Sequence, residues 1–363
     1  MAIESARAAL AQTSTPPNPM LSLTLGFPVD GVGATTVTAA AMEQIAWLWQ
    51  RPPLVDADEA RLRASILSAA DRASAIAAEV RRRHLDVVAA EESLVAARAA
   101  ATAADEFRVA VQSQVAAGDA PSNALLEADG RAAFSRRARA RAEGELRNAR
   151  VRLLEAMGCS EVTVEWRTDG AWPTSTAPSE SAAQCLSDAL ARRLDVAAAD
   201  ALVVAAEAEC RAAGATRIPS VSLGAEYNQM TDTPTTLGPS GSVEVPIFDV
   251  GNARVATALA KLADARWAAR AARQGAATET QFALAGLASA NDRWQSGSEP
   301  MCRAAEARLR AVRASADAGV VPTRDVVEAT AMLAERTMEA IDDRREAAGA
   351  AIALERSLAG GAP

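Results

Sequence analysis

The stretch Ile218-Pro219-Ser220-Val221-Ser222-Leu223-Gly224 decides the fold class that this sequence of 363 residues predicts, because a similar stretch occurs much earlier in the chain. The earlier one is Asn18-Pro19-Met20-Leu21-Ser22-Leu23-Thr24-Leu25-Gly26, and Pro19 and Pro219 lie 200 positions apart. In both, apolar residues alternate with small or polar ones, which is typical of a β-strand with one apolar face. The sequence therefore predicts two related extended segments.

Two further landmarks recur at nearly the same spacing, which indicates a tandem duplication. Ala117-Gly118-Asp119-Ala120-Pro121 resembles Ala318-Gly319-Val320-Val321-Pro322, and Leu153–Gly158 resembles Leu354–Gly360. In each copy a β-hairpin precedes a long helix, a turn with glycine and proline, and a second helix. The predicted fold class is mainly α with a small β part, in two tandem repeats of a β-hairpin plus long antiparallel helices.

The landmarks also set the expected boundaries. Repeat 1 covers 1–158, with a hairpin at about 18–49 and helices at about 54–117 and 122–157. A polar linker covers 159–179. Repeat 2 covers 180–360, with a helix at 180–213, a hairpin at about 218–249 and helices at about 252–318 and 323–358. The run Ser296–Pro300 predicts a kink or break in the helix at 252–318, because proline and glycine weaken a helix interior.

The first repeat lacks a counterpart of the helix that opens the second repeat, except for a short tail at 3–12. We therefore expect Met1 to be an internal start, and repeat 1 to be incomplete at its N-terminus, with a signal peptide among the missing parts. The given sequence contains neither a secretory signal nor an apolar run of about 18 residues, the length that a membrane-spanning helix needs.

Composition argues against several classes of function. Half of the residues are apolar but only 3% are aromatic, which suits long helices packed through small side chains. His84 is the only histidine, so a multi-histidine metal site within one chain and a histidine-based catalytic triad are excluded. The net charge of −8 argues against nucleic-acid binding, and the four cysteines lack metal-binding or redox spacing. We expect no enzyme activity, no metal and no cofactor.

Several motifs together resemble the TolC-like outer-membrane efflux proteins. The strand at Ile218–Gly224 is similar to one of that family, and so is the strand at Val243–Asp249, which leads through Val250-Gly251-Asn252 into a helix. The turn Asp317–Glu328 resembles a turn of the family, and the opening Asn18-Pro19 resembles that of its heavy-metal-efflux branch. The resemblance extends over nearly the whole chain, both copies included.

The resemblance implies an architecture and a function. Three identical chains would form a homotrimer, with four strands from each building one 12-stranded β-barrel in the outer membrane and the helices continuing as a trimeric α-barrel into the periplasm. Such a trimer is a passive duct that exports small molecules or metal ions, with a periplasmic adaptor and an inner-membrane pump as partners. The segment Leu48–Pro53 departs from the family pattern, which leaves open whether the first hairpin completes the barrel.

Asp325 and Glu328 are the candidate gate residues. They lie three positions apart at the start of a helix, so they share a face, and three chains would form an acidic ring. The family resemblance implies that this ring is the periplasmic gate. The alternative is that both are ordinary acidic residues at a helix start, where the helix dipole favours them.

The turns supply candidate docking residues, and three aromatic residues are candidates for the membrane interface. The resemblance implies that the adaptor docks at Gly118, Gly319, Val320 and Val321, although the glycines are also ordinary turn residues. Trp47, Trp49 and Phe248 lie near strand–helix junctions. Aromatic residues at such positions lie either at the membrane interface or in a core.

Other classes of protein remain as alternatives. A soluble structural protein built from helical hairpins would show a sustained heptad seam, and none is evident in the alanine-rich helices. A periplasmic adaptor would carry one helical hairpin rather than two copies. An all-α enzyme is the remaining alternative, and no acid–base constellation supports it.

Overall fold

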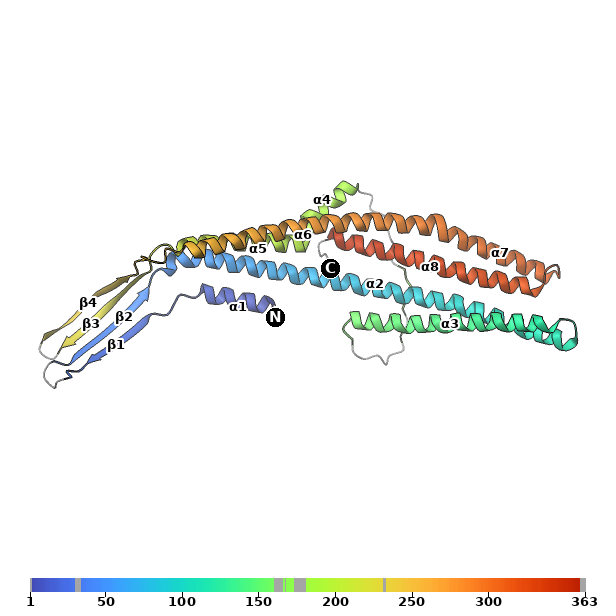
Figure 1. The fold of residues 1–363 in the computed structure, drawn as a ribbon, viewed down its shortest axis with the longest axis horizontal. Helices are drawn as coiled ribbons and strands as arrows, with labels where there is room; N and C mark the ends of the chain where they lie inside the picture. The colour runs from blue at the N-terminus through green and yellow to red at the C-terminus, as the bar shows by residue number, and fades with distance from the viewer. Residues whose placement is uncertain are drawn as a thin grey trace. The chain divides into compact units, whose positions relative to one another are not determined.

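A computed structural model describes residues 2–29, 34–159, 166, 168–172, 181–230 and 233–359. Most of the linker 159–179, residue 180 and the end of repeat 2 at Gly360 lie outside the described residues. Within the described part the chain is mainly helical and contains one four-stranded antiparallel sheet (Figure 1). The prediction of a mainly α fold with a small β part is confirmed.

The chain folds into two compact units, and each unit contains parts of both repeats. The sheet unit comprises Met1–Asp71 and Leu194–Gly275, and the hairpin unit comprises Arg72–Arg193 and Ala276–Pro363. The compact units are therefore not the two repeats expected from the sequence. The reason is that elements of the two repeats pair with each other inside each unit.

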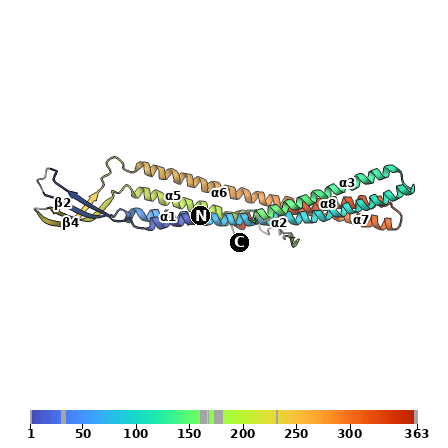
Figure 2. The same cartoon turned by 90° about the horizontal axis from the view of Figure 1, so that it is seen from below.

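The described residues of the sheet unit form four strands and four helical segments. Its elements are α1 (Ala2–Ser14), β1 (Met20–Gly26), β2 (Thr36–Gln44), the start of α2 (Trp47–Ala117), α5 (Leu194–Ala215), β3 (Val221–Met230), β4 (Thr233–Val243) and the start of α6 (Asn252–Asp292). The strands lie side by side in the order β1-β2-β3-β4, each antiparallel to the next (Figure 1 and Figure 2). The central pair, β2 with β3, joins the two repeats.

The first hairpin is shorter than the expected 18–49. Strand β2 ends at Gln44, and α2 begins at Trp47 rather than at about 54. The helix therefore includes Pro52 and Pro53, which have no backbone N–H to donate to the hydrogen bonds of the helix. The chain enters α2 through a turn in which the Gln50 N–H donates to the Ala46 carbonyl at 3.1 Å. Although the sequence departs from the family pattern here, β2 pairs with both β1 and β3.

The register gives the sheet one apolar face and one mostly small, polar face. Residues directly opposite each other share a face, and Leu21 lies opposite Ala41, as Leu223 does opposite Gly241. Leu21 is 78% exposed and Leu237, on the same face, is 75% exposed. Glu43 also lies on this face, opposite Leu223. The polar face carries Ser22, Thr24, Thr38, Ser222, Gly224, Glu226, Asn228, Thr236, Gly238 and Ser240. The predicted alternation is thus confirmed.

The hairpin unit contains two antiparallel helix hairpins, whose turns lie at the same end of the unit (Figure 1 and Figure 2). Its elements are the rest of α2, α3 (Ser122–Ala156), α4 (Ala182–Arg192), the end of α6, the π-helical turn η1 (Arg293–Ser298), α7 (Glu299–Asp317) and α8 (Thr323–Ala359). Small and aliphatic residues form its cores. Leu85 of α2 is 1% exposed and packs with Ala348 and Ile352 of α8, which joins the two repeats in this unit as well.

Two helices differ from the expected ones. The helix expected at 180–213 is divided into α4 and α5 at Arg193, whose backbone is extended with ψ 130°. The Arg193 side chain is buried and binds Glu279 at 2.7 Å, an ion pair that sequence spacing does not reveal. In the helix expected at 252–318, the region of the predicted kink or break holds the π-helical turn η1, and helical structure continues through Pro300 into α7. A π turn absorbs an extra residue without ending the helix.

Candidate functional site

Both helix hairpins turn through the same backbone motif. In each, the N–H of the turn glycine donates three residues back and the next N–H donates five residues back, at 2.9–3.1 Å. These bonds form a Schellman motif, which requires a left-handed residue at its centre. Gly118 has φ 84° and Gly319 has φ 71°, as the motif requires. The two repeats therefore turn in the same way although their other turn residues differ.

The left-handed conformation leads to the first prediction. A Cβ on Gly319 would meet no atom within 4 Å, so only the backbone angle opposes a side chain there. We expect Gly319→Ala to destabilise the turn by about 1 kcal/mol, and amide hydrogen exchange at Val320 to become faster. The control is Gly130→Ala, because Gly130 lies inside α3 with open space around it and alanine favours a helix. Equal exchange rates in both variants would contradict the prediction.

The second turn carries the candidate docking valines. Val320 is 76% exposed and Val321 is half-buried, so the turn offers one fully accessible apolar side chain. The matched positions of the first turn are Asp119 and Ala120. The two turns therefore share a backbone shape but present different chemistry to a partner, and the docking role of Gly118, Gly319, Val320 and Val321 stays a prediction.

The candidate gate residues lie just after the second turn. Helix α8 begins at Thr323, and the Asp325 N–H donates to the Pro322 carbonyl at 3.0 Å in its first turn. Asp325 is half-buried and Glu328 is exposed on the same side of the helix. Within the described residues neither carboxylate has an ion pair to a basic group. The structure thus leaves both carboxylates available, and their gate role stays a prediction.

An ion pair between the two hairpins lies beside these residues, and the sequence did not reveal it. Arg324 of α8 lies 3.2 Å from Glu127 of α3, and Arg131 lies 2.8 Å from the same carboxylate. Glu127 is the position of repeat 1 that matches Glu328. The duplication could have drawn attention to Glu127, but its pairing with Arg324 depends on how the hairpins pack.

The three candidate interface aromatics have different surroundings. Phe248 is 98% exposed, whereas Trp47 and Trp49 are half-buried in the first turn of α2. The Arg51 guanidinium lies 5.4 Å from the ring centre of Trp47, and both indole N–H groups are buried without a hydrogen-bond partner in the described structure. The structure therefore separates one exposed ring from two packed ones.

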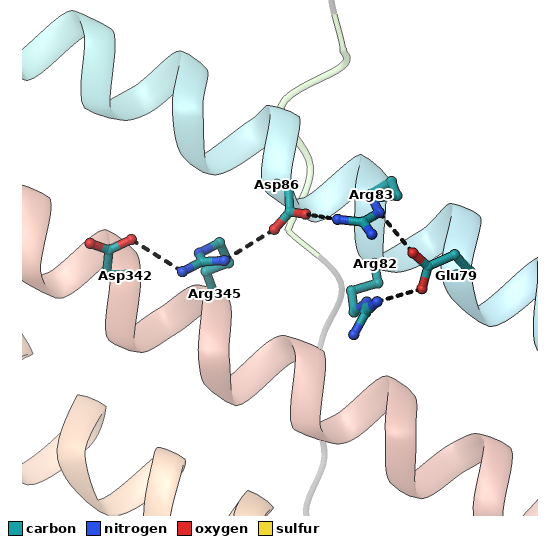
Figure 3. A network of polar contacts seen from close by, with 6 residues as sticks. All are labelled: Glu79, Arg82, Arg83, Asp86, Asp342 and Arg345. Atoms are coloured by element: carbon teal, nitrogen blue, oxygen red, sulfur yellow. Dashed lines mark hydrogen bonds and ion pairs between the residues drawn. The ribbon is translucent and has the colours of Figure 1, made fainter. Parts of the chain in front are cut away.

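A polar network joins α2 to α8 in the hairpin unit. Arg345 of α8 donates to Asp86 of α2 at 3.1 Å, and Asp86 lies 3.4 Å from Arg83 on its own helix (Figure 3). Asp342 extends the network on the α8 side, and Glu79 with Arg82 and Arg83 extends it along α2 (Figure 3). Opposite charges thus hold the two repeats in register beside the Leu85 core.

The same segment of α8 holds the π-helical turn. Arg293 of η1 binds Glu346 and lies 3.7 Å from Asp343, and the Ser298 hydroxyl donates to Asp343. Ser298 is 2% exposed, so its hydroxyl needs this acceptor. The π turn is therefore a specifically bonded feature of this fold.

The described part of the linker, residues 166 and 168–172, is bound to the helices by its tryptophans. The Trp172 indole N–H donates to Glu92 of α2 at 2.7 Å, and the Arg344 guanidinium lies 4.4 Å from its ring centre. Arg344 also lies 5.7 Å from the ring centre of Trp294 in η1. One arginine between two indoles thus links this segment to α8 and to the π turn.

Glu91 binds the same segment and gives a pH-dependent prediction. Burial acts to raise the pKa of Glu91, but hydrogen bonds from Thr168 and Arg150, with the charge of Arg150, outweigh it and lower the pKa below its ordinary value. A lowered folded-state pKa adds stability above the unfolded pKa of about 4.3, and this is lost as the pH falls through the folded value. We expect the fluorescence of Trp166, beside Arg150, to change as the pH falls through the lowered folded-state pKa of Glu91.

Two substitutions test this assignment. Glu91→Gln removes the titrating group and should abolish the acid-induced change, while Trp166→Phe removes the reporter and should remove the signal alone. A fluorescence change of the same size and midpoint in Glu91→Gln would show that another group is responsible.

The described residues provide neither a metal site nor a membrane-spanning helix. The described ranges contain no group of three or more His, Cys, Asp or Glu residues placed to hold a metal ion. His84 has one neighbouring carboxylate, that of Asp169 at 4.0 Å. Among the described helices, none has a stretch apolar and long enough to cross a bilayer.

The comparison with protein families decides the assignment. Residues 185–360 match the model of the family described as outer membrane efflux protein. This part of the chain belongs to the outer membrane efflux protein family. The predicted resemblance to TolC-like proteins is thereby confirmed, and the match covers the second repeat, whose strand and turn motifs carried most of that resemblance.

Solved structures of a membrane protein and of two outer membrane channels are similar to this chain in fold. A membrane protein from Pseudomonas aeruginosa matches with a TM-score of 0.80 at 20% identity, over 99% of this chain and 85% of that one. The CmeC outer membrane channel of Campylobacter jejuni matches with a TM-score of 0.81 at 14% identity, over 99% of this chain and 81% of that one. The open-state MtrE outer membrane channel of Neisseria gonorrhoeae matches with a TM-score of 0.77 at 17% identity, over 99% of this chain and 84% of that one. The search of curated proteins gave no match.

Proposed function

We propose that this chain forms the outer-membrane duct of a tripartite efflux or secretion system, a passive homotrimeric channel for small molecules or metal ions. The observation that carries the proposal is the sheet, whose apolar face is largely exposed on β1, β3 and β4 and partly exposed on β2, while its other face is mostly small and polar. Such a sheet suits a barrel wall between lipid and a water-filled lumen.

The edges of the sheet indicate how copies would join. Strands β1 and β4 are the outer strands of the order β1-β2-β3-β4, and three antiparallel steps make them run in opposite directions. Strand β1 of one copy can therefore pair antiparallel with β4 of the next. About eight strands are the fewest that close a membrane barrel, so four cannot, whereas three copies supply twelve.

The gate is assigned to Asp325 and Glu328. Three copies would bring six carboxylates to the end of the helical duct, where they would repel each other, bind hydrated cations and narrow the passage. The ion pair between Arg324 and Glu127, next to this ring, would hold the two hairpins of each chain together in the closed state. Each such pair is exposed and weak, so a partner could open the ring.

The remaining assignments follow from this placement. The exposed Val320 and the equivalent turns at Gly118 and Gly319 would dock a periplasmic adaptor, which in turn binds an inner-membrane pump. The exposed ring of Phe248 would lie at the membrane interface, as would the half-buried Trp47 and Trp49 at the start of α2. The duct would lie in the outer membrane with a periplasmic extension and carry out no chemical step.

Removal of the acidic ring tests the gate. We expect the double variant Asp325→Asn, Glu328→Gln to raise single-channel conductance in planar lipid bilayers severalfold and to abolish block by a trivalent cation, because the repelling carboxylates and the cation site are lost together. The control is Glu335→Gln, an exposed carboxylate farther along α8. Block that persists in the double variant would place the gate elsewhere.

The assembly itself is tested by purification. The duct requires a detergent-dependent product with the mass of three chains. A chain that stays monomeric and soluble without detergent would contradict the proposed function.

A further inference from the structure

The four strands carry almost no charge, which makes each charged residue on them informative. Among the described residues of β1 to β4, the charged residues are Glu43 and Glu226, and neither has a basic partner on the sheet. The register places Glu43 opposite Leu223 on the apolar face, and Glu226 opposite Ala40 and Gly238 on the polar face. One carboxylate therefore lies on each side of the sheet.

The surroundings of Glu226 leave it uncovered. Its cross-strand partners, Ala40 and Gly238, have no side chain beyond a methyl group, and Gly224 is its neighbour on the same face of β3. The side chain of Glu226 is half-buried by the strands themselves. No basic side chain lies on the described residues of the four strands to neutralise its carboxylate.

Hydrogen bonds hold this carboxylate in place. The Asn228 amide nitrogen donates to Glu226 Oε1 at 2.7 Å, and the Thr38 hydroxyl donates to Asn228 Oδ1 at 2.6 Å. The chain of bonds runs from β2 to β3 along the polar face. The carboxylate is therefore oriented by its own sheet, whereas a free surface glutamate would sample many rotamers.

We propose that Glu226 sets the charge selectivity of the barrel, with one carboxylate from each of three chains facing the lumen and favouring cationic solutes over anionic ones. This inference rests on the proposed trimeric duct, in which the polar face lines the lumen. Three fixed negative charges attract cations and repel anions of similar size, and the described strand residues carry no other charge on the polar face. The exported substrate class is then cationic.

The test is the potassium-to-chloride permeability ratio, measured from the reversal potential of the full-length channel in planar bilayers under a potassium chloride gradient. The variants are made in the Asp325→Asn, Glu328→Gln background, so that the gate carboxylates do not contribute. We expect Glu226→Gln to lower the ratio at least about threefold at 0.1 M salt, and Glu226→Lys to favour chloride. The shift should shrink at 1 M salt, where the screening length falls to about 3 Å.

The matched control is Glu43→Gln, which removes the same charge from the opposite face of the sheet. An unchanged permeability ratio in Glu226→Gln, or an equal shift in Glu43→Gln, would overturn the inference. If these variants still form channels of normal conductance, the proposed function of the chain as a duct is not contradicted. Failure of the unsubstituted chain to form any channel would instead overturn the proposed function, and this inference with it.

Discussion

Gly224→Ala is expected to abolish assembly of the chain in the outer membrane. A Cβ at this position would lie 2.1 Å from the Ala41 carbonyl oxygen and 2.9 Å from the Met42 Cα, far inside contact distance. Both atoms belong to the backbone of β2, which cannot move away without breaking its pairing with β3. Because this pair joins the two hairpins, we expect detergent-resistant trimer to fall more than about tenfold.

Gly238→Ala provides the control for this prediction. Gly238 lies on the same polar face in β4, and an added Cβ there would meet no atom within 4 Å. We expect its trimer yield to stay near that of the unsubstituted chain, as measured by immunoblot of outer-membrane fractions. Normal yield in Gly224→Ala would show that β2 and β3 do not pair as described.

Leu85→Ala is expected to have the largest effect in the hairpin unit. Leu85 is 1% exposed and packs against Ala348 and Ile352 of α8, and both alanine-rich helices lack bulk that could fill the space. Truncation of a buried leucine costs about 2–5 kcal/mol, and the small neighbours favour the upper half of that range. Denaturant unfolding of the detergent-solubilised protein would measure the loss.

The control at the same position is Leu85→Met, which keeps the volume and should cost less than about 1.5 kcal/mol. If alanine and methionine destabilise the protein equally, the packing between α2 and α8 is not what Leu85 provides.

The strands and turns were predictable from the sequence because their signals are local. Alternation at Leu21, Leu23 and Leu25 depends on residues two apart, and the turn at Gly319 depends on a left-handed residue and a following proline. Even Glu43, which breaks the alternation of β2, could be placed on the apolar face by parity alone. These features need no knowledge of the rest of the fold.

The contacts between segments that lie far apart in the sequence were not predictable, because they depend on how those segments pack. The pair of Arg193 with Glu279, which divides the expected helix 180–213, links residues 86 positions apart. Arg324 with Glu127 and Arg344 with Trp172 are further examples. A single sequence shows that these residues are charged or aromatic, but it does not show which partner each one meets.

The pairing of β2 with β3 also has a consequence for the order of folding. Thr38 bonds to Asn228, 190 positions later, so closing this loop carries a large entropic cost before any contact compensates it. The two hairpins should therefore form early and join late. Until then, each exposes an apolar face and an unpaired edge, which favour aggregation. We expect a chain of this design to depend on a holding chaperone between its synthesis and its assembly.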